Sequence, residues 1–397
     1  MSVLIILLII SLFYFTPKQY KVVVALGLLA HIFLLIYNIY FNHIKLMWTS
    51  DAFNFYQNAI HYNLHGALIG NFNMGAIVYV YFIAFLFKHT YLTSNLMLIG
   101  QLSNITFWLF SMLMFIKICQ KLLIDRSATI NLALLLLLIN PYTLIATTSL
   151  LRESSQVALT SVTLYMLILF IQSQKARYII LGFFFSVFAG LTHYGLLACL
   201  LLTCAFTALL CLYQKNVKTP LPLKLKFCLW VLALVFAYDI FIYIKFLHPI
   251  LFHKIQFFAA YSGAANTSYP AVITHGHFYD FVLSWFNYMF YPFPWHIHNI
   301  TDLYASSFGI LRLILLSFAI GAYYLEKESI IKKSMLVLLI CFFITTLAYS
   351  AGTSNYGTSM RHQILTFWII AILGVRGFFM LLLTQLPKPL KIFRRSP

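Results

Sequence analysis

The chain has few charged residues and very few acidic ones. Charged residues make up 9% of the 397 positions, and eight residues are Asp or Glu against 26 Lys or Arg. A soluble domain carries about 25% charged residues, so the composition argues against an ordinary water-soluble protein. With so few carboxylates, the candidates for acid or base chemistry are also few.

Motifs for metals and nucleotides are absent as well. The six cysteines show no Cys-x-x-Cys spacing, which argues against a zinc site and a disulfide framework. The two His-x-His pairs, at 275–277 and 296–298, are not joined by a cysteine, and on a helix their rings would point apart. No Walker or Rossmann sequence is present. We therefore expect no metal, no cofactor and no soluble nucleotide substrate.

What the chain does contain is apolar sequence. Hydrophobic residues reach 62%, and they come in runs near the roughly 20 residues that a helix needs to cross a bilayer. The runs are 2–15, 22–41, 96–118, 130–150, 157–172, 178–192, 195–213, 227–245, 308–325, 334–350 and 364–384. Strand-like alternation is absent, so each run predicts a helix. The sequence predicts an all-α, polytopic transmembrane helical bundle of about 11–12 spans, forming one domain over 1–397.

Basic residues concentrate in the links between these runs, which is typical of loops that stay on the cytoplasmic side. They lie at 117–126, 175–177, 215–226, 327–333 and 388–395. The basic residues behind the net charge of +18 therefore indicate which loops face the cytoplasm. Nucleic-acid binding is not expected. The outer side receives two long loops, 42–70 and 246–307, which we expect to carry short amphipathic helices. The segment 71–87 is expected to dip into the membrane and return.

Asp51 is the first candidate for chemistry, directly after the second run. Ser50 or Asp51 can cap a surface helix, and the Asp51 carboxylate can also act as a general base towards a sugar hydroxyl. Asp239 lies inside a predicted span and is expected to be structural.

A second candidate group follows Asn140-Pro141, where the proline should interrupt its helix. Arg152 and Glu153 lie side by side between two apolar runs. They can be a membrane anchor with its counter-charge, or Arg152 can grip phosphate through its planar guanidinium.

The late outer segments supply further candidates. The Pro-Phe-Pro-Trp sequence ending at Trp295 should be extended, and it can pack on an acyl chain, stack on sugar rings or serve only for packing. Arg361 enters the last run alone among small polar residues and needs a partner, for which a ligand phosphate is suitable. His362 is an alternative base beside Asp51 and Glu153.

Four short elements together resemble bacterial Wzy-type polysaccharide polymerases and related membrane glycosyltransferases of the GT-C class. They are Asp-Ala-x-x-x-Tyr at 51–56, Leu-Leu-Arg-Glu at 150–153 after Asn-Pro, Pro-Phe-Pro-Trp at 292–295, and Asn-Tyr-Gly-Thr-x-x-Arg-His at 355–362. The resemblance implies an enzyme of the bacterial inner membrane. It would join oligosaccharide repeat units carried on undecaprenyl diphosphate at the periplasmic face, for O-antigen or capsule, with membrane lipids and a chain-length regulator protein as further partners.

The resemblance implies that the family's basic periplasmic residues correspond to Arg152 and Arg361 and its early acidic residue to Asp51. Together with the residues selected from the sequence itself, the expected catalytic residues are Asp51, Arg152, Glu153, Arg361 and His362, and the expected substrate-binding residues are Tyr56, Tyr279, Asp280, Trp295, Asn355 and Tyr356.

Two alternatives remain open at this stage. One is a GT-C glycosyltransferase that uses a polyprenyl-phosphate sugar, although the paired acids typical of such enzymes are missing here. The other is a transporter or flippase of lipid-linked sugar without catalysis. Its typical midplane charges and matching halves are not evident in the sequence.

Overall fold

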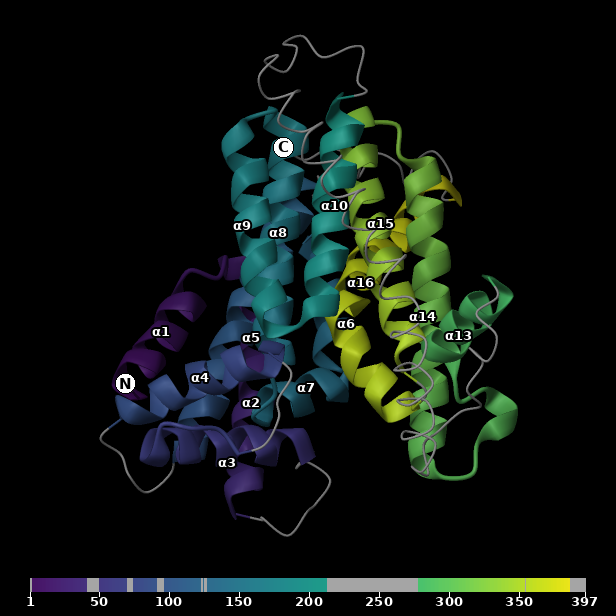
Figure 1. Ribbon diagram of the computed structural model, residues 1–397. Coiled ribbons are helices and arrows are strands. Elements are labelled where there is room, and N and C mark those ends of the chain that lie inside the picture. Colours follow the sequence, from purple (N-terminus) through teal and green to yellow (C-terminus); the bar gives the residue numbers. More distant parts are fainter. Residues whose placement is uncertain are drawn as a thin grey trace.

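A computed structural model describes residues 2–40, 50–69, 74–90, 96–122, 124, 127–212, 278–353 and 355–385. Within these ranges all regular elements are helices, which confirms the predicted all-α class (Figure 1). The α-helices are α1 (Ser2–Tyr14), α2 (Lys21–Tyr40), α3 (Ser50–His65), α4 (Met74–Lys88), α5 (Leu96–Lys121), α6 (Ser127–Leu138), α7 (Pro141–Thr148), α8 (Glu153–Ser173), α9 (Ala176–Thr192), α10 (Tyr194–Leu212), α13 (Phe278–Phe290), α14 (Ile300–Leu325), α15 (Ser329–Ala351) and α16 (Tyr356–Gln385). Two short 3₁₀ helices, η1 (Lys18–Tyr20) and η3 (Pro294–His296), accompany them.

The chain is a multi-pass membrane protein. Seven helices in the described ranges are long and apolar enough to span a bilayer, and an eighth span results if the bent pair α6 and α7 is counted as one. The helices α1, α4 and α9 are apolar but shorter. The predicted span 227–245, with Asp239, lies outside the described residues, as does the first part of the loop 246–307.

The predicted interruption at Pro141 is confirmed. Helix α6 ends at Leu138, and α7 begins at Pro141 with a change of direction of 66°. Asn140 caps α7, since its side-chain oxygen accepts a hydrogen bond from the Tyr142 backbone N–H at 3.1 Å. Proline suits the first position of a helix because its missing N–H would have no partner there. The break therefore separates two half-helices inside the bundle.

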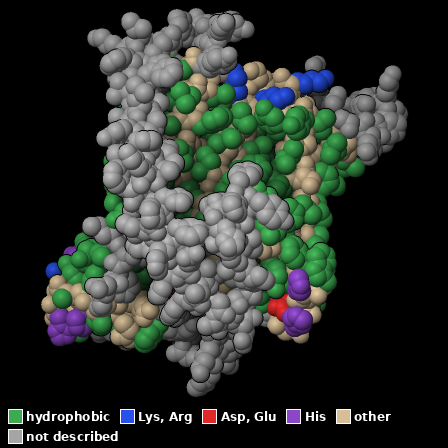
Figure 2. Space-filling model, turned by 45° about the vertical axis from the view of Figure 1, so that its right-hand side comes forward, with side chains coloured by type: hydrophobic (Ala, Val, Ile, Leu, Met, Phe, Trp, Pro, Cys, Tyr) green, Lys and Arg blue, Asp and Glu red, His purple; other side chains and the backbone are tan. Residues whose placement is uncertain are grey.

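Charged groups separate towards the two ends of the bundle. Most of the Lys and Arg visible in Figure 2 lie at the upper end, His and the acidic atoms at the lower end, and hydrophobic side chains between them. At the basic end Arg376 pairs with Glu326, and the Gln172 side chain donates to the Lys121 carbonyl at 2.8 Å. This is the asymmetry that the positive-inside rule associates with a cytoplasmic end.

Each of the two predicted outer loops contains a helix. Helix α3 lies within 42–70 and α13 within 246–307. In Figure 1, α8, α9, α10, α14 and α15 stand side by side, whereas α3 lies crosswise below them. Helix α3 thereby carries Asp51 beneath the ends of the long helices.

The predicted dip and return over 71–87 is wrong. One uninterrupted helix, α4, runs from Met74 to Lys88. The stretch 76–87 contains neither glycine nor proline, so nothing in it favours a reversal of the chain. Helix α4 instead packs against α3, where the rings of Phe55 and Tyr79 lie 5.3 Å apart.

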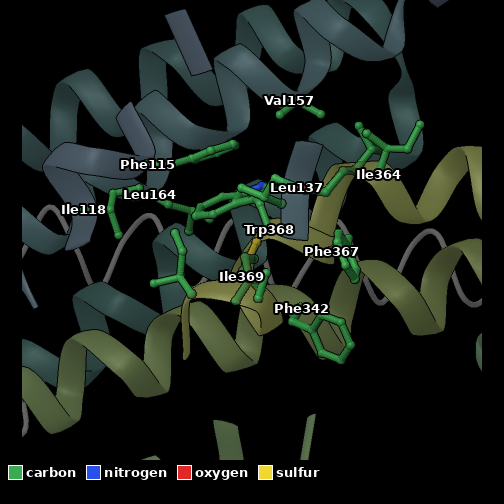
Figure 3. Close-up of a cluster of buried hydrophobic side chains, with 14 of the residues drawn as sticks. Phe115, Ile118, Leu137, Val157, Leu164, Phe342, Ile364, Phe367, Trp368 and Ile369 are labelled. Atoms are coloured by element: carbon green, nitrogen blue, oxygen red, sulfur yellow. Dashed lines mark hydrogen bonds between the residues drawn. The ribbon is translucent and has the colours of Figure 1, made fainter. Parts of the chain in front are cut away.

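The core is centred on α16, whose inner face packs against α5, α6, α8 and α14. The Trp368 ring stacks on Phe115 at 4.7 Å among aliphatic side chains (Figure 3). A Cβ atom at Gly377 would meet the Phe318 carbonyl oxygen at 2.0 Å, and one at Gly374 would meet the Leu315 oxygen at 2.5 Å. These two glycines therefore allow the close approach of α14 and α16, as small residues do between membrane helices.

Candidate functional site

Three charged side chains from distant parts of the sequence meet at the end of the bundle opposite the basic end. The Arg361 Nη1 atom donates to Asp51 Oδ2 at 2.7 Å, and Arg361 Nε lies 2.8 Å from Glu153 Oε1. The second contact is electrostatic, because the Nε–H group is not aligned with an acceptor. We call Asp51, Glu153 and Arg361 the ionic cluster. It joins the first turns of α3 and α8 to the second turn of α16.

The two carboxylates of the ionic cluster differ in access. The Glu153 side chain is 2% exposed, whereas that of Asp51 is 44% exposed. Arg361 is therefore not the solitary arginine that the sequence suggests: its partners come from the protein. A buried guanidinium held by two carboxylates is already charge-compensated, which weakens the hypothesis that Arg361 itself grips a phosphate.

Arg152 stands beside this cluster without a carboxylate partner among the described residues. Its Nη1 atom donates to the Thr192 carbonyl at 3.1 Å, and Gln156 Nε2 donates to the same oxygen at 3.4 Å. Although Arg152 and Glu153 are adjacent in sequence, Glu153 pairs with Arg361. The interpretation of Arg152 and Glu153 as an anchor with its counter-charge is thus not supported.

Two histidines and a tyrosine line the cluster. The Tyr349 ring lies 4.9 Å from His193 and 4.8 Å from His362. Burial, together with the charges of Arg152 and Arg361, lowers the pKa of His193 to about 4. The His193 ring is therefore neutral at neutral pH and adds no charge to the site.

Several buried polar atoms here have no hydrogen-bond partner. They are Glu153 Oε2, His193 Nδ1, Tyr349 Oη and His362 Nδ1. Buried polar groups in native proteins are nearly always paired, so each exception requires an explanation. These four atoms can form hydrogen bonds with water or with a polar ligand at this end of the bundle.

Asn104, deep in the apolar helix α5, holds the segment that presents Arg152. Its Nδ2 atom donates to the carbonyls of Ser149 at 2.8 Å and Leu151 at 2.9 Å, and its Oδ1 accepts from the Tyr79 hydroxyl at 3.2 Å. The link between α7 and α8 is thus fixed by one fully buried amide. Asn104 is a positioning residue for the site.

Replacing Asn104 by leucine should lower the stability of the protein by roughly 1–3 kcal/mol, because two buried carbonyls and the Tyr79 hydroxyl lose their partner. The midpoint of thermal unfolding in detergent measures this loss. Asn131→Leu is the matched control, since Asn131 makes one exposed hydrogen bond, to Gln19. Equal midpoints for the two variants would contradict the role of Asn104.

Tyr356 and Asn355, both expected to bind substrate, have internal roles. The buried Tyr356 hydroxyl donates to Asp302 Oδ1. Asp302 also accepts from the His298 backbone N–H at 2.9 Å, at the start of α14. The Asn355 side chain accepts from the backbone N–H groups of Gly357 and Thr358, at 2.8 and 3.3 Å. These contacts tie the starts of α14 and α16 together and leave Tyr356 no face towards a ligand.

The remaining predicted residues lie at the same end of the bundle or outside the described side chains. Trp295 is 74% exposed and stacks on Phe293 at 5.1 Å. The expectation that this stretch is wholly extended is wrong at Pro294–His296, which form η3, because proline also suits the first position of a helical turn. Tyr56 packs edge-on against Phe87 at 5.8 Å. Tyr279 and Asp280 belong to α13, and their side chains are outside the described part.

A small apolar cavity lies next to the ionic cluster. Ser154, the residue after Glu153, lines it, and so does Ile364, one turn after Arg361. Phe115, Phe367 and Trp368 form other walls, and the same three side chains belong to the buried apolar cluster in Figure 3. The site thus combines charged groups at the bundle end with an adjoining apolar space.

Within the described residues no group of three His, Cys, Asp or Glu side chains is placed to hold a metal ion. Comparisons with protein-family models, with curated proteins and with solved structures give no match for this chain.

Proposed function

We propose that the protein is a membrane glycosyltransferase that polymerises oligosaccharide repeat units carried on undecaprenyl diphosphate, at the periplasmic face of a bacterial inner membrane. The observation that supports this most is the meeting of Asp51, Glu153 and Arg361, with Arg152 alongside, at the end opposite the basic loops. Four short sequence elements, spread over residues 51–362, predicted these residues. Three of the four elements contribute a side chain to the ionic cluster.

Asp51 is the proposed general base. An acceptor sugar hydroxyl attacks the anomeric carbon of the donor sugar, and Asp51 takes the hydroxyl proton as the new glycosidic bond forms. Among the cluster carboxylates it is the exposed one, and Arg361 fixes its position. Glu153 contacts Arg361 from the buried side.

Arg152 is the proposed partner of the leaving group. As the anomeric carbon–oxygen bond breaks, its electron pair goes to the diphosphate, where negative charge grows. A fixed cation in a partly desolvated site stabilises such charge most effectively. Arg152 suits this role better than Arg361, because no described carboxylate pairs with it.

The apolar cavity beside the cluster supports a lipid-borne donor. Its walls are aromatic and aliphatic, and it adjoins the residues that follow Glu153 and Arg361. Contact between part of a prenyl chain and these walls would place its diphosphate near the bundle end. This arrangement fits a donor that reaches the enzyme through the membrane.

The test is a reaction with purified components. The protein in liposomes, given undecaprenyl-diphosphate-linked repeat units from the same bacterium, should yield a gel ladder spaced by one repeat unit. One undecaprenyl diphosphate should be released for each bond formed. Consumption of the donor without longer products would contradict polymerisation.

The transporter hypothesis is the second candidate, and one observation favours it. The span formed by α6 and α7 is broken at Asn140–Pro141, and an arginine, Arg312, is buried among the helices. Interrupted helices and charges within the membrane are typical of transporters. In the same liposomes, movement of unaltered lipid-linked units between leaflets without a ladder would favour this second candidate.

A further inference from the structure

Arg312 is a buried cation whose charge nothing in the described protein balances. It lies in α14 with 2% of its surface exposed. Its Nε atom donates to the Phe308 carbonyl at 3.2 Å, whereas Nη2 has no hydrogen-bond partner. No described carboxylate forms an ion pair with it. Sequence reasoning passed over this residue, and the proposed transfer reaction does not use it.

The membrane makes this arrangement costly. Arg312 follows Asp302, in the first turn of α14, by ten residues, which places it about 15 Å along the helix. That is about half the thickness of a hydrocarbon core of about 30 Å. A charged side chain at such a depth costs several kcal/mol and usually marks a functional site with a partner.

Arg312 lines a small cavity between α7, α14 and α16. Asn140 and Tyr142, at the start of α7, line it on one side, and Gln363 and Phe367 of α16 line it on another. Gln363 Oε1 is buried without a partner. The Gln363 Nε2 atom donates a hydrogen bond to the Tyr288 carbonyl. A second orphaned polar atom, the Tyr304 hydroxyl, belongs to a ring 6.1 Å from that of Tyr142.

The charged and polar groups that line this cavity favour the binding of an anion. Its lining combines one uncompensated guanidinium with uncharged polar groups, and no described acidic residue lines it. The positive end of the α7 helix dipole points to the same space, because α7 begins at Pro141. A guanidinium offers two parallel donors to an oxyanion, which matches phosphate geometry.

We propose that Arg312, with Gln363 and the start of α7, forms a phosphate-binding site inside the bundle, separate from the ionic cluster. Arg361 is held by Asp51 and Glu153 and is charge-compensated, whereas Arg312 is not. The ligand is a phosphate-bearing molecule that enters the bundle, either a prenyl phosphate from the membrane or free phosphate. The site does not depend on glycosyl transfer.

The test measures ligand-dependent thermal stability of the full chain in phosphatidylcholine nanodiscs. The probes are geranylgeranyl phosphate, its alcohol geranylgeraniol and inorganic phosphate. The phosphate lipid should raise the unfolding midpoint of the wild type, whereas the alcohol should not. Stabilisation by inorganic phosphate to the same extent would assign the site to free phosphate, and stabilisation by the lipid alone would assign it to a membrane ligand. No difference between the phosphate lipid and the alcohol overturns the proposal.

Single-residue variants test whether Arg312 and Gln363 bind the phosphate lipid. Arg312→Gln should weaken binding of geranylgeranyl phosphate roughly 10- to 100-fold, since a charge-assisted contact is lost. Arg177→Gln, at the basic end of the bundle, should bind it as the wild type does. Gln363→Glu keeps the side-chain shape but supplies the carboxylate that the cavity lacks, so it should also lose binding while remaining folded. Wild-type binding by either Arg312→Gln or Gln363→Glu, or an equal loss in Arg177→Gln, overturns the proposal.

Discussion

Asp51→Asn should reduce polymer formation about 10²- to 10³-fold, because general-base catalysis contributes about 10²–10⁴ to a rate. Asparagine keeps the shape of the side chain and can still accept a hydrogen bond from Arg361, but it cannot take a proton from the acceptor hydroxyl. Arg361 retains Glu153 as a counter-ion, so the fold should persist. The rate of ladder formation in the liposome reaction, normalised to folded protein, measures the effect.

Glu328→Gln is the matched control for this experiment. Glu328 is an acidic residue beside Lys327 at the opposite end of the bundle, and neutralising it should leave the ladder unchanged. Near wild-type activity of Asp51→Asn at equal abundance would remove Asp51 from the role of base. Activity lost together with the unfolding midpoint would indicate that Asp51 serves chiefly to hold Arg361.

Much of the fold follows from hydropathy and helix-breaking residues. The long apolar runs became the long helices, and Asn140-Pro141 became the break between α6 and α7. The prediction for 71–87 is wrong because shortness and the Gly-Asn-Phe-Asn opening at 70–73 suggest a reversal, whereas the stretch 76–87 contains no glycine or proline to end a helix. Its packing on α3 depends on tertiary contacts that no local pattern encodes.

The pairing among the site residues could not be predicted from the sequence. Asp51, Glu153 and Arg361 could each be selected from their polarity next to apolar runs, but the pairing among them depends on which helices are neighbours. A single sequence does not show which helices are neighbours, so a ligand phosphate was expected as the partner of Arg361. The hydrogen bond from Tyr356 to Asp302 was not predictable for the same reason, since the two residues lie 54 positions apart.

Two residues were missed although a signal existed. Asn104 and Arg312 are polar residues inside apolar runs, where an amide or a guanidinium is costly and therefore informative. Asn104 proved to hold the carbonyls before Arg152, and Arg312 faces a cavity. Polar residues within predicted spans therefore carry as much information as those in the loops.

Arg152→Ala should lower the rate of polymer formation about 10²- to 10³-fold, by analogy with the removal of one donor that stabilises developing negative charge. Arg152→Lys keeps the charge but loses the planar pair of donors, so a bidentate phosphate contact should be impaired in this variant too. The measurement is the single-turnover rate at saturating donor, which isolates the bond-forming step from binding.

Arg177 supplies the matched comparison for Arg152, because it lies at the basic end and contacts the neighbouring Tyr178. Arg177→Ala and Arg177→Lys should leave the single-turnover rate unchanged. If Arg152→Lys reacts as the wild type while Arg152→Ala does not, a positive charge alone suffices and the bidentate contact is wrong. If both Arg152 variants react normally, the leaving diphosphate must be stabilised elsewhere, and the uncompensated charge of Arg312 then becomes the first residue to test in the same assay.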